Sequence, residues 1–410
     1  MRHKLLIFST LILLSVSLPA QPRVLHTTGH TATITCMQYS PDGRRLATSA
    51  DNNNSIHFWD TQTHRLLYIL KERGLGGVTF RFHPDGQSLL AVYGSGKVIR
   101  WGLTPYGGGW EMQRWDFPAM TLRSPEFSPD GTLLALPLEN KIQIPDVLSF
   151  DLRYELSIPK PNFELRVSFS PDNRFLCINT TGNVLIKEIA TDSVVQTLAE
   201  CNRYYMNLAA FFHKSNQVIT VSPRGLLSSW EFPSGKLLER EHLPDSTQIR
   251  LVIPGADKNY LGFGKNQDIL IWDLEKQNIA HTFSSVHQPF AQDLAWLEDE
   301  QGRKATISVG LDDQVSVAQL GRGNHAQELT HFDYHCGGTT CIDISPDKKY
   351  YATGGWDNTI LLYGLQEQAP RPLWTLRHIG STKAWVAIAQ NGTFHSDSAS
   401  RVKLDVPEKR

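Results

Sequence analysis

One motif returns along the chain at a nearly fixed interval. In five copies a Ser/His-Pro-Asp turn follows an aromatic or aliphatic residue and precedes a second apolar run: "YSPDGRRLATSA" from residue 39, "FHPDGQSLLAVY" from 82, "FSPDGTLLALPL" from 127, "FSPDNRFLCINT" from 169 and "ISPDKKYYATGG" from 344. Weaker copies begin at Phe212, Ile253 and Trp296, so successive copies lie 43, 45, 42, 43, 41, 43 and 48 residues apart. A period of this size predicts eight copies of one supersecondary unit.

Each copy has the pattern of a four-stranded antiparallel meander. The first copy reads "TITCMQY", "RRLATSA", "SIHFWD" and "RLLYIL", with turn residues between the runs. Proline presets φ and glycine accepts a positive φ in such turns, so short strands can follow one another as hairpins. A single small sheet cannot bury both of its faces, whereas sheets packed radially around an axis can. We therefore expect an all-β fold, a β-propeller of eight four-stranded blades, with seven or nine blades as the alternatives.

The turns, the period and the endings "FWD" at 58–60 and "IWD" at 271–273 resemble the WD40-repeat family over residues 23–378. The copies are degenerate, because Trp101-Gly102, Pro145-Asp146 and Trp230-Glu231 stand where the family has Trp-Asp. Proline cannot donate to a sheet ladder, so Pro145 should end its strand. In this family an N-terminal strand commonly completes the last blade. Residues 22–28 can take that place, and residues 372–376 are the other candidate.

The chain divides into three parts. Residues 1–20 resemble a secretory signal peptide, because Arg2 and Lys4 precede an apolar run from Leu5 to Leu18 and small residues suit cleavage after Ala20. That run holds 14 residues, short of the about 20 that span a bilayer, so an uncleaved anchor is the weaker interpretation. The propeller is expected over 21–384, and 385–410 form a half-repeat, which starts a ninth blade or caps the ring, and a tail. We expect a secreted or periplasmic protein with no membrane insertion after cleavage.

Charge argues against polyelectrolyte partners. The chain has 40 Lys+Arg against 41 Asp+Glu, a formal net charge of −1, so no long-range field attracts nucleic acid or anionic lipid. Five cysteines leave at least one unpaired in a monomer, so the chain is not a disulfide scaffold.

The segment "HFDYHCGGTTC" at 331–341 contains four donors that zinc prefers. Aligning the last copy on the first, however, places His335 on His30 and Cys341 on Cys36. The family resemblance implies that such a histidine bonds a Ser/Thr, an Asp of the next turn and a Trp within one blade. The residues expected in these networks are His30, Asp51, Trp59, His287, Asp312, His335 and Asp357. His331 and Cys336 are not explained in this way, so a metal site or a Cys336–Cys341 disulfide stays open beside the favoured structural role, and no cofactor is expected.

Four consecutive inner strands of the closed ring carry a polar residue just before their last apolar one: Gln38, Arg81, Glu126 and Asp343. Inner strands flank the central channel, so these residues should form a polar arc along it. Ion pairing of Arg81 with Glu126 or bonding to Gln38 is favoured over contact with a ligand, because buried charges are usually paired.

The resemblance implies docking of a protein partner, although a fold alone does not fix a function. The family's usual contact face carries the loops before the first strands and the turns between the second and third strands. Tyr, Trp and Arg anchor interfaces, and this face should hold Arg203, Tyr204, Tyr205, Arg224 and Trp356. The sequence lacks His-Glu-x-x-His and Gly-x-Ser-x-Gly motifs, which weakens the alternative of a hydrolase or lactonase-like propeller. A propeller that binds a small ligand or glycan is the third alternative.

Overall fold

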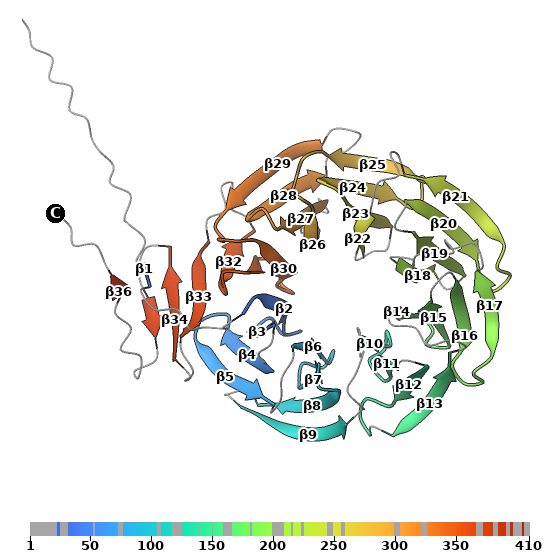
Figure 1. Cartoon of the computed structure of the whole chain (residues 1–410), viewed down its shortest axis with the longest axis horizontal. Helices are drawn as coiled ribbons and strands as arrows, with labels where there is room; N and C mark the ends of the chain where they lie inside the picture. The colour runs from blue at the N-terminus through green and yellow to red at the C-terminus, as the bar shows by residue number, and fades with distance from the viewer. Residues whose placement is uncertain are drawn as a thin grey trace, which may run out of the picture.

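Thirty-two of the strands form a closed ring of eight blades (Figure 1). The structure, a computed structural model, describes residues 23–24, 32–51, 54–72, 77–104, 108–116, 125–138, 140–149, 151–158, 166–180, 183–198, 209–214, 216–222, 225–243, 249–255, 259–298, 304–320, 326–365, 372–379, 384–390, 394–396 and 404–405. The ring confirms the eight blades predicted from the repeat.

No helix long and apolar enough to cross a membrane occurs in the described ranges.

Each blade is a four-stranded antiparallel meander built from one continuous segment. Blades 1 to 4 comprise β2 (Ile34–Tyr39), β3 (Arg45–Ala50), β4 (Ser55–Asp60) and β5 (Leu66–Lys71); β6 (Val78–Phe82), β7 (Ser88–Tyr93), β8 (Lys97–Leu103) and β9 (Gly109–Asp116); β10 (Glu126–Phe127), β11 (Leu134–Pro137), β12 (Lys141–Pro145) and β13 (Leu152–Ser157); and β14 (Arg166–Phe169), β15 (Phe175–Asn179), β16 (Val184–Glu188) and β17 (Val194–Leu198). β12 ends at Pro145, as predicted.

The weaker copies of the repeat form blades of the same order. Blades 5 to 8 comprise β18 (Ala209–Lys214), β19 (Gln217–Val221), β20 (Leu226–Glu231) and β21 (Leu237–His242); β22 (Ile249–Pro254), β23 (Tyr260–Lys265), β24 (Asp268–Asp273) and β25 (Asn278–Phe283); β26 (Ala291–Glu298), β27 (Lys304–Gly310), β28 (Gln314–Leu320) and β29 (Ala326–Asp333); and β30 (Thr339–Ile344), β31 (Tyr350–Gly355), β32 (Ile360–Gly364) and β33 (Trp374–Ile379).

The core lies between adjacent blades. The second strands β3 and β7 are buried at every residue, because each lies between neighbouring blades that cover both of its faces. Between blades 1 and 2, for example, Phe58 stacks on Tyr68 with ring centroids 4.6 Å apart and meets Phe82 edge-on at 6.1 Å. This two-sided burial explains why the second and third runs are rich in apolar residues and why polar residues such as Thr48, Ser49 and His57 are buried in them.

The repeated Pro-Asp turns pack on one another around the ring. In blade 1 the Ser40 hydroxyl donates to Asp42 at 2.6 Å, and Gly43 adopts a φ of 69° that favours glycine. A Cβ at Gly43 would lie 3.7 Å from Pro346 of blade 8, and one at Gly86 would lie 3.7 Å from Pro41 of blade 1. The junction that closes the ring therefore repeats an internal one.

Of the two candidate segments, 372–376 supplies the outer strand of blade 8, and closure by the N-terminal segment is wrong. β33, which contains most of the segment 372–376, pairs with β32 as the outer strand of blade 8. β1 (Arg23–Val24), from the segment 22–28, pairs instead with β36 (Leu404–Asp405) outside the ring. Among the described strands none is exchanged between blades 1 and 8, and side-chain packing and hydrogen bonds join the two blades.

The C-terminal half-repeat extends blade 8 outward. β34 (Ala384–Ala389) pairs with β33, and β35 (Phe394–Ser396) pairs with β34, which gives this sheet six strands (Figure 1). These strands therefore do not begin a separate ninth blade.

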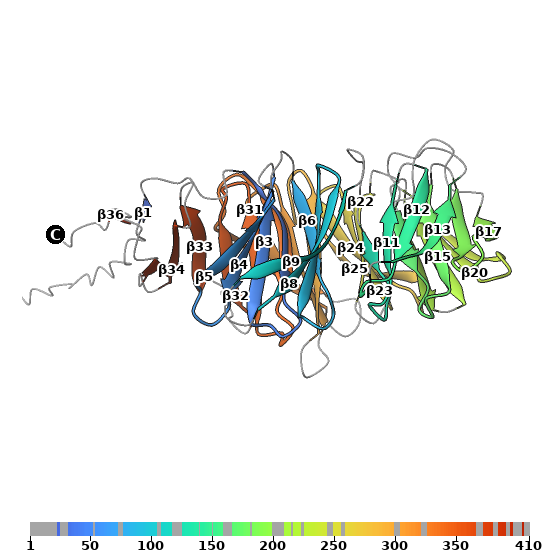
Figure 2. The ribbon, with the colours of Figure 1, turned by 90° about the horizontal axis from the view of Figure 1, so that it is seen from below.

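The ring seen edge-on has two faces formed by turns (Figure 2). We call the top face the one that carries the turns between the second and third strands and the segments that enter the first strands. The bottom face carries the Pro-Asp turns and the turns between the third and fourth strands.

Candidate interaction surface on the top face

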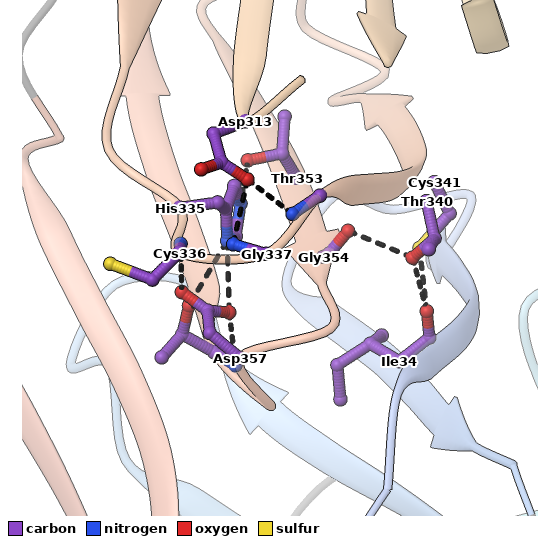
Figure 3. A network of polar contacts seen from close by, with 12 residues as sticks. Ile34, Asp313, His335, Cys336, Gly337, Thr340, Cys341, Thr353, Gly354 and Asp357 are labelled. Atoms are coloured by element: carbon purple, nitrogen blue, oxygen red, sulfur yellow. Dashed lines mark hydrogen bonds and ion pairs between the residues drawn. The ribbon is translucent and has the colours of Figure 1, made fainter. Parts of the chain in front are cut away.

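A buried histidine ties together the top of blade 8 (Figure 3). His335 Nδ1 lies 3.0 Å from Asp357 Oδ1, and its Nε2 lies 2.9 Å from the Thr353 hydroxyl. Asp357 Oδ2 also accepts the Cys336 backbone N–H at 3.1 Å. The network joins the segment before β30 to the turn between β31 and β32, so it holds two top-face loops in one arrangement.

The charge of Asp357 is maintained in this network although the residue is largely buried. Burial raises its pKa, but the His335 and Thr359 side chains and the Thr359 N–H together lower the pKa of Asp357 to about 2. Asp357 therefore stays ionised throughout the physiological pH range.

Blade 7 contains an equivalent network. His287 Nδ1 lies 3.0 Å from Asp312 Oδ1, and Nε2 lies 2.9 Å from the Ser308 hydroxyl. Burial raises the pKa of Asp312, but the bonds from His287 and the Gln288 N–H lower it below its ordinary value.

In blade 1 the structure describes one bond of the predicted network, that of Trp59. Trp59 Nε1 donates to Thr48 Oγ1 at 3.1 Å, as Trp230 does to Thr220 in blade 5 at 2.9 Å. Asp51 is exposed, and its N–H bonds to the Thr33 carbonyl at 2.9 Å. His30 lies outside the described residues.

A bond between blades fixes the entry to β30. Asp313 Oδ1, from the top turn of blade 7, accepts the Gly337 N–H at 2.6 Å and also bonds the Gly338 N–H (Figure 3). Both glycines have φ above 100°, where a Cβ would be strained. Trp356 N–H in turn donates to the Gly338 carbonyl at 2.9 Å. Blades 7 and 8 together thus hold the backbone beneath Trp356.

Trp356 presents an accessible ring above this rigid backbone. Its exposed fraction is 52%, and Tyr334 in the neighbouring segment is 38% exposed. Together with the exposed Cys336, they define the blade 7–8 top patch. The sequence analysis identified Trp356 but missed Tyr334. The signal for Tyr334 was its position directly before His335, the histidine of the predicted network. Arg203, Tyr204, Tyr205 and Arg224 lie outside the described residues.

The donors of the 331–341 segment lie apart from one another. His331 Nδ1 is 2.8 Å from the Ser316 hydroxyl on the neighbouring strand, and Cys341 is buried in β30. Cys336 and Cys341 are free thiols, so the disulfide alternative is wrong. Among the described residues no group of three or more His, Cys, Asp or Glu side chains is placed to hold a metal ion.

The channel residues bond the backbone of the next blade. Asp343 of blade 8 accepts the Tyr39 N–H of blade 1 at 2.6 Å, and Gln38 of blade 1 accepts the Phe82 N–H of blade 2 at 2.9 Å. Asp293 of blade 7, which sequence reasoning missed, accepts the Ile342 N–H of blade 8 at 3.2 Å. These N–H groups lie on the free edges of the inner strands, so each bond satisfies an edge donor and joins two blades.

Both of these carboxyl groups have raised pKa values. Burial raises the pKa of Asp293 and that of Asp343 to about 6 each, although the charge of Arg81 lowers both. Gln38, one of the partners predicted for Arg81, uses its Oε1 to accept the Phe82 N–H. Glu126 is half-buried in β10 and pairs through its backbone with Ala135.

Comparison with known proteins identifies the same repeat. A family profile described as "WD domain, G-beta repeat" matches residues 22–60 and 326–363. Periodic tryptophan protein 2 of Arabidopsis thaliana is 30% identical over 83 residues, which are 20% of this chain and span only 9% of that protein. The computationally designed Ika8 protein has a TM-score of 0.68 and 18% identity to this chain, over 84% of this chain and 100% of that one. This last similarity concerns the fold alone.

Proposed function

Because the chain belongs to the WD40-repeat β-propeller family, whose members typically serve as interaction scaffolds, we propose that it is an exported, noncatalytic scaffold that docks a protein on its top face. The observation that carries the proposal is Trp356, a half-exposed aromatic side chain above a backbone held by two blades. Binding energy concentrates in aromatic anchors of this type, and a fixed backbone reduces the entropy lost on association.

Export is the second part of the proposal. It is supported by the basic start and the apolar run of residues 1–20 and by small residues before the expected cleavage site. Mass spectrometry of the N-terminus of the protein from its native host tests it. A mature chain that begins near residue 21 supports export, and a chain that retains residues 1–20 in the cytoplasm contradicts it.

Docking is tested by crosslinking the tagged full-length protein in its native host and identifying the proteins that co-purify. The test variant is Trp356→Ala, and Trp110→Ala is the matched control. Trp110 is 51% exposed but lies on β9, the outer strand of blade 2, away from the top face.

A stoichiometric partner retained by Trp110→Ala and lost by Trp356→Ala supports docking at the blade 7–8 top patch. A partner bound equally by both variants contradicts that location. Absence of any enriched partner, under conditions that recover known complexes, contradicts the scaffold function.

A further inference from the structure

A pocket opens on the bottom face at the junction that closes the ring. It has a volume of about 800 Å³, within the range of pockets that bind ligands. Blade 1 contributes its Pro-Asp turn and the turn between β4 and β5, and blade 8 contributes its Pro-Asp turn and the start of β33. The pocket therefore lies on the opposite face from Trp356.

The lower part of the pocket is largely apolar. Tyr39 and Leu362 are buried there, and Leu373 is half-buried beside them. His64 stacks on Trp374 with ring centroids 4.1 Å apart, so blades 1 and 8 form one aromatic wall. The buried Tyr39 hydroxyl has no hydrogen-bond partner among the described residues. The leucine side chains and the aromatic wall together favour a large apolar side chain of the ligand.

Polar groups are concentrated at the exposed rim. Asp42 and Arg44 come from blade 1, and Asp347 and Lys349 come from blade 8, so the four formal charges cancel. Each carboxylate is used in its own turn: Asp42 Oδ1 accepts the Ser40 hydroxyl at 2.6 Å and the Arg44 N–H at 3.1 Å. Asp347 makes the same two bonds with Ser345 and Lys349, at 2.6 Å and 3.1 Å.

The balance of charge selects the class of ligand. A strongly acidic or basic ligand would meet as many like as opposite charges at the rim. A peptide backbone is neutral and offers both N–H donors and carbonyl acceptors to the rim, while one side chain fills the apolar part. Saccharides fit less well, because their hydroxyls would face the apolar surface of Leu362 and Leu373 without partners.

We propose that this closure-junction pocket binds a short peptide segment of a partner protein, with one large aromatic or aliphatic anchor flanked by residues of no net charge. It is a second contact surface, separate from the top patch. Tyr350, 45% exposed at the rim, contacts the peptide beside the anchor. The proposal does not depend on docking at Trp356.

A phage-displayed library of random twelve-residue peptides, panned against the immobilised full chain, provides the test. The most enriched peptide is then labelled with fluorescein and titrated against the wild type and three variants by fluorescence anisotropy. Tyr350→Ala and Gln62→Ala alter the exposed rim of the pocket, and Trp356→Ala is the matched aromatic control on the top face. Circular dichroism and the thermal midpoint verify that each variant is folded.

Support requires enriched peptides that share one large apolar residue and lack net charge, with affinity at least tenfold weaker for Tyr350→Ala and within twofold of wild type for Trp356→Ala. Peptides affected only by Trp356→Ala would support top-face docking and overturn this proposal. It is also overturned if no peptide is enriched, if Tyr350→Ala and Gln62→Ala both bind like the wild type, or if chitotriose or maltotriose binds in this pocket while peptides do not.

Discussion

Replacing Asp343 with Asn tests the charge that lies between blades 8 and 1. Asp343 accepts the Tyr39 N–H across the junction, and burial raises its pKa to about 6. A carboxyl in the unfolded chain has a pKa of about 3.9. Between these values the folded state binds a proton that the unfolded state does not bind, so the free energy of unfolding falls as pH rises through this window.

The size of the effect follows from the two pKa values. A difference of about two pH units corresponds to about 3 kcal/mol, the upper limit of what the ionised Asp343 costs above pH 6. Asn keeps an oxygen that can accept the Tyr39 N–H but carries no charge. We therefore expect Asp343→Asn to raise the free energy of unfolding by about 1–3 kcal/mol at pH 7.5 and by less than about 1 kcal/mol at pH 4.

Urea unfolding at both pH values measures this difference. Gln38→Glu provides the converse variant, because Gln38 makes the equivalent bond at the next junction without a charge. This variant should lose stability at pH 7.5 and much less at pH 4. An Asp343→Asn protein that is less stable than the wild type by the same amount at both pH values would refute the reasoning.

Three other substitutions or reactions probe the blade structure. His335→Ala should cost about 3 kcal/mol, because Asp357 and Thr353 lose a buried partner, whereas His331→Ala should cost under about 1 kcal/mol by urea unfolding. Gly43→Ala should lower the free energy of unfolding by about 1–2 kcal/mol, because the φ of Gly43 is 69°. The control Gly77→Ala should change it by less than about 0.5 kcal/mol, because the nearest atom to a Cβ there lies at an ordinary 3.6 Å. Equal losses in the two variants would contradict the role of the turn. In a Cys201→Ser background, Ellman's reagent should react rapidly with one thiol, Cys336, since Cys177 and Cys341 are buried and burial raises the pKa of the half-buried Cys36. A second fast thiol would contradict this arrangement.

The blades were predictable because their information is local. Each turn and apolar run is specified within about ten residues, so even the weak copy at Trp296 falls in the inner strand β26. The outer strand of blade 8 was not predictable in this way. The segments 22–28 and 372–376 are both short and each begins with a proline followed by apolar residues mixed with polar ones, so only pairing with β32 distinguishes them.

The surfaces were less predictable than the blades. Trp356 follows from its place in a top-face turn, but Asp293 stands outside the alignment that identified Gln38 and Asp343, and its partner Ile342 is 49 residues away. The pocket combines side chains of the first and last blades, which become neighbours only when the ring closes.

Closure without strand exchange also affects how the protein can be assembled and altered. Every blade is complete in one stretch of sequence, so each can form its sheet in order as the chain emerges, and blade 8 does not need to wait for the first residues to return. A gene duplication or deletion of one repeat would then leave all other sheets intact, and the packing between blades would adapt to the new angle at each junction. The ring can therefore change its number of blades by steps of one repeat during evolution.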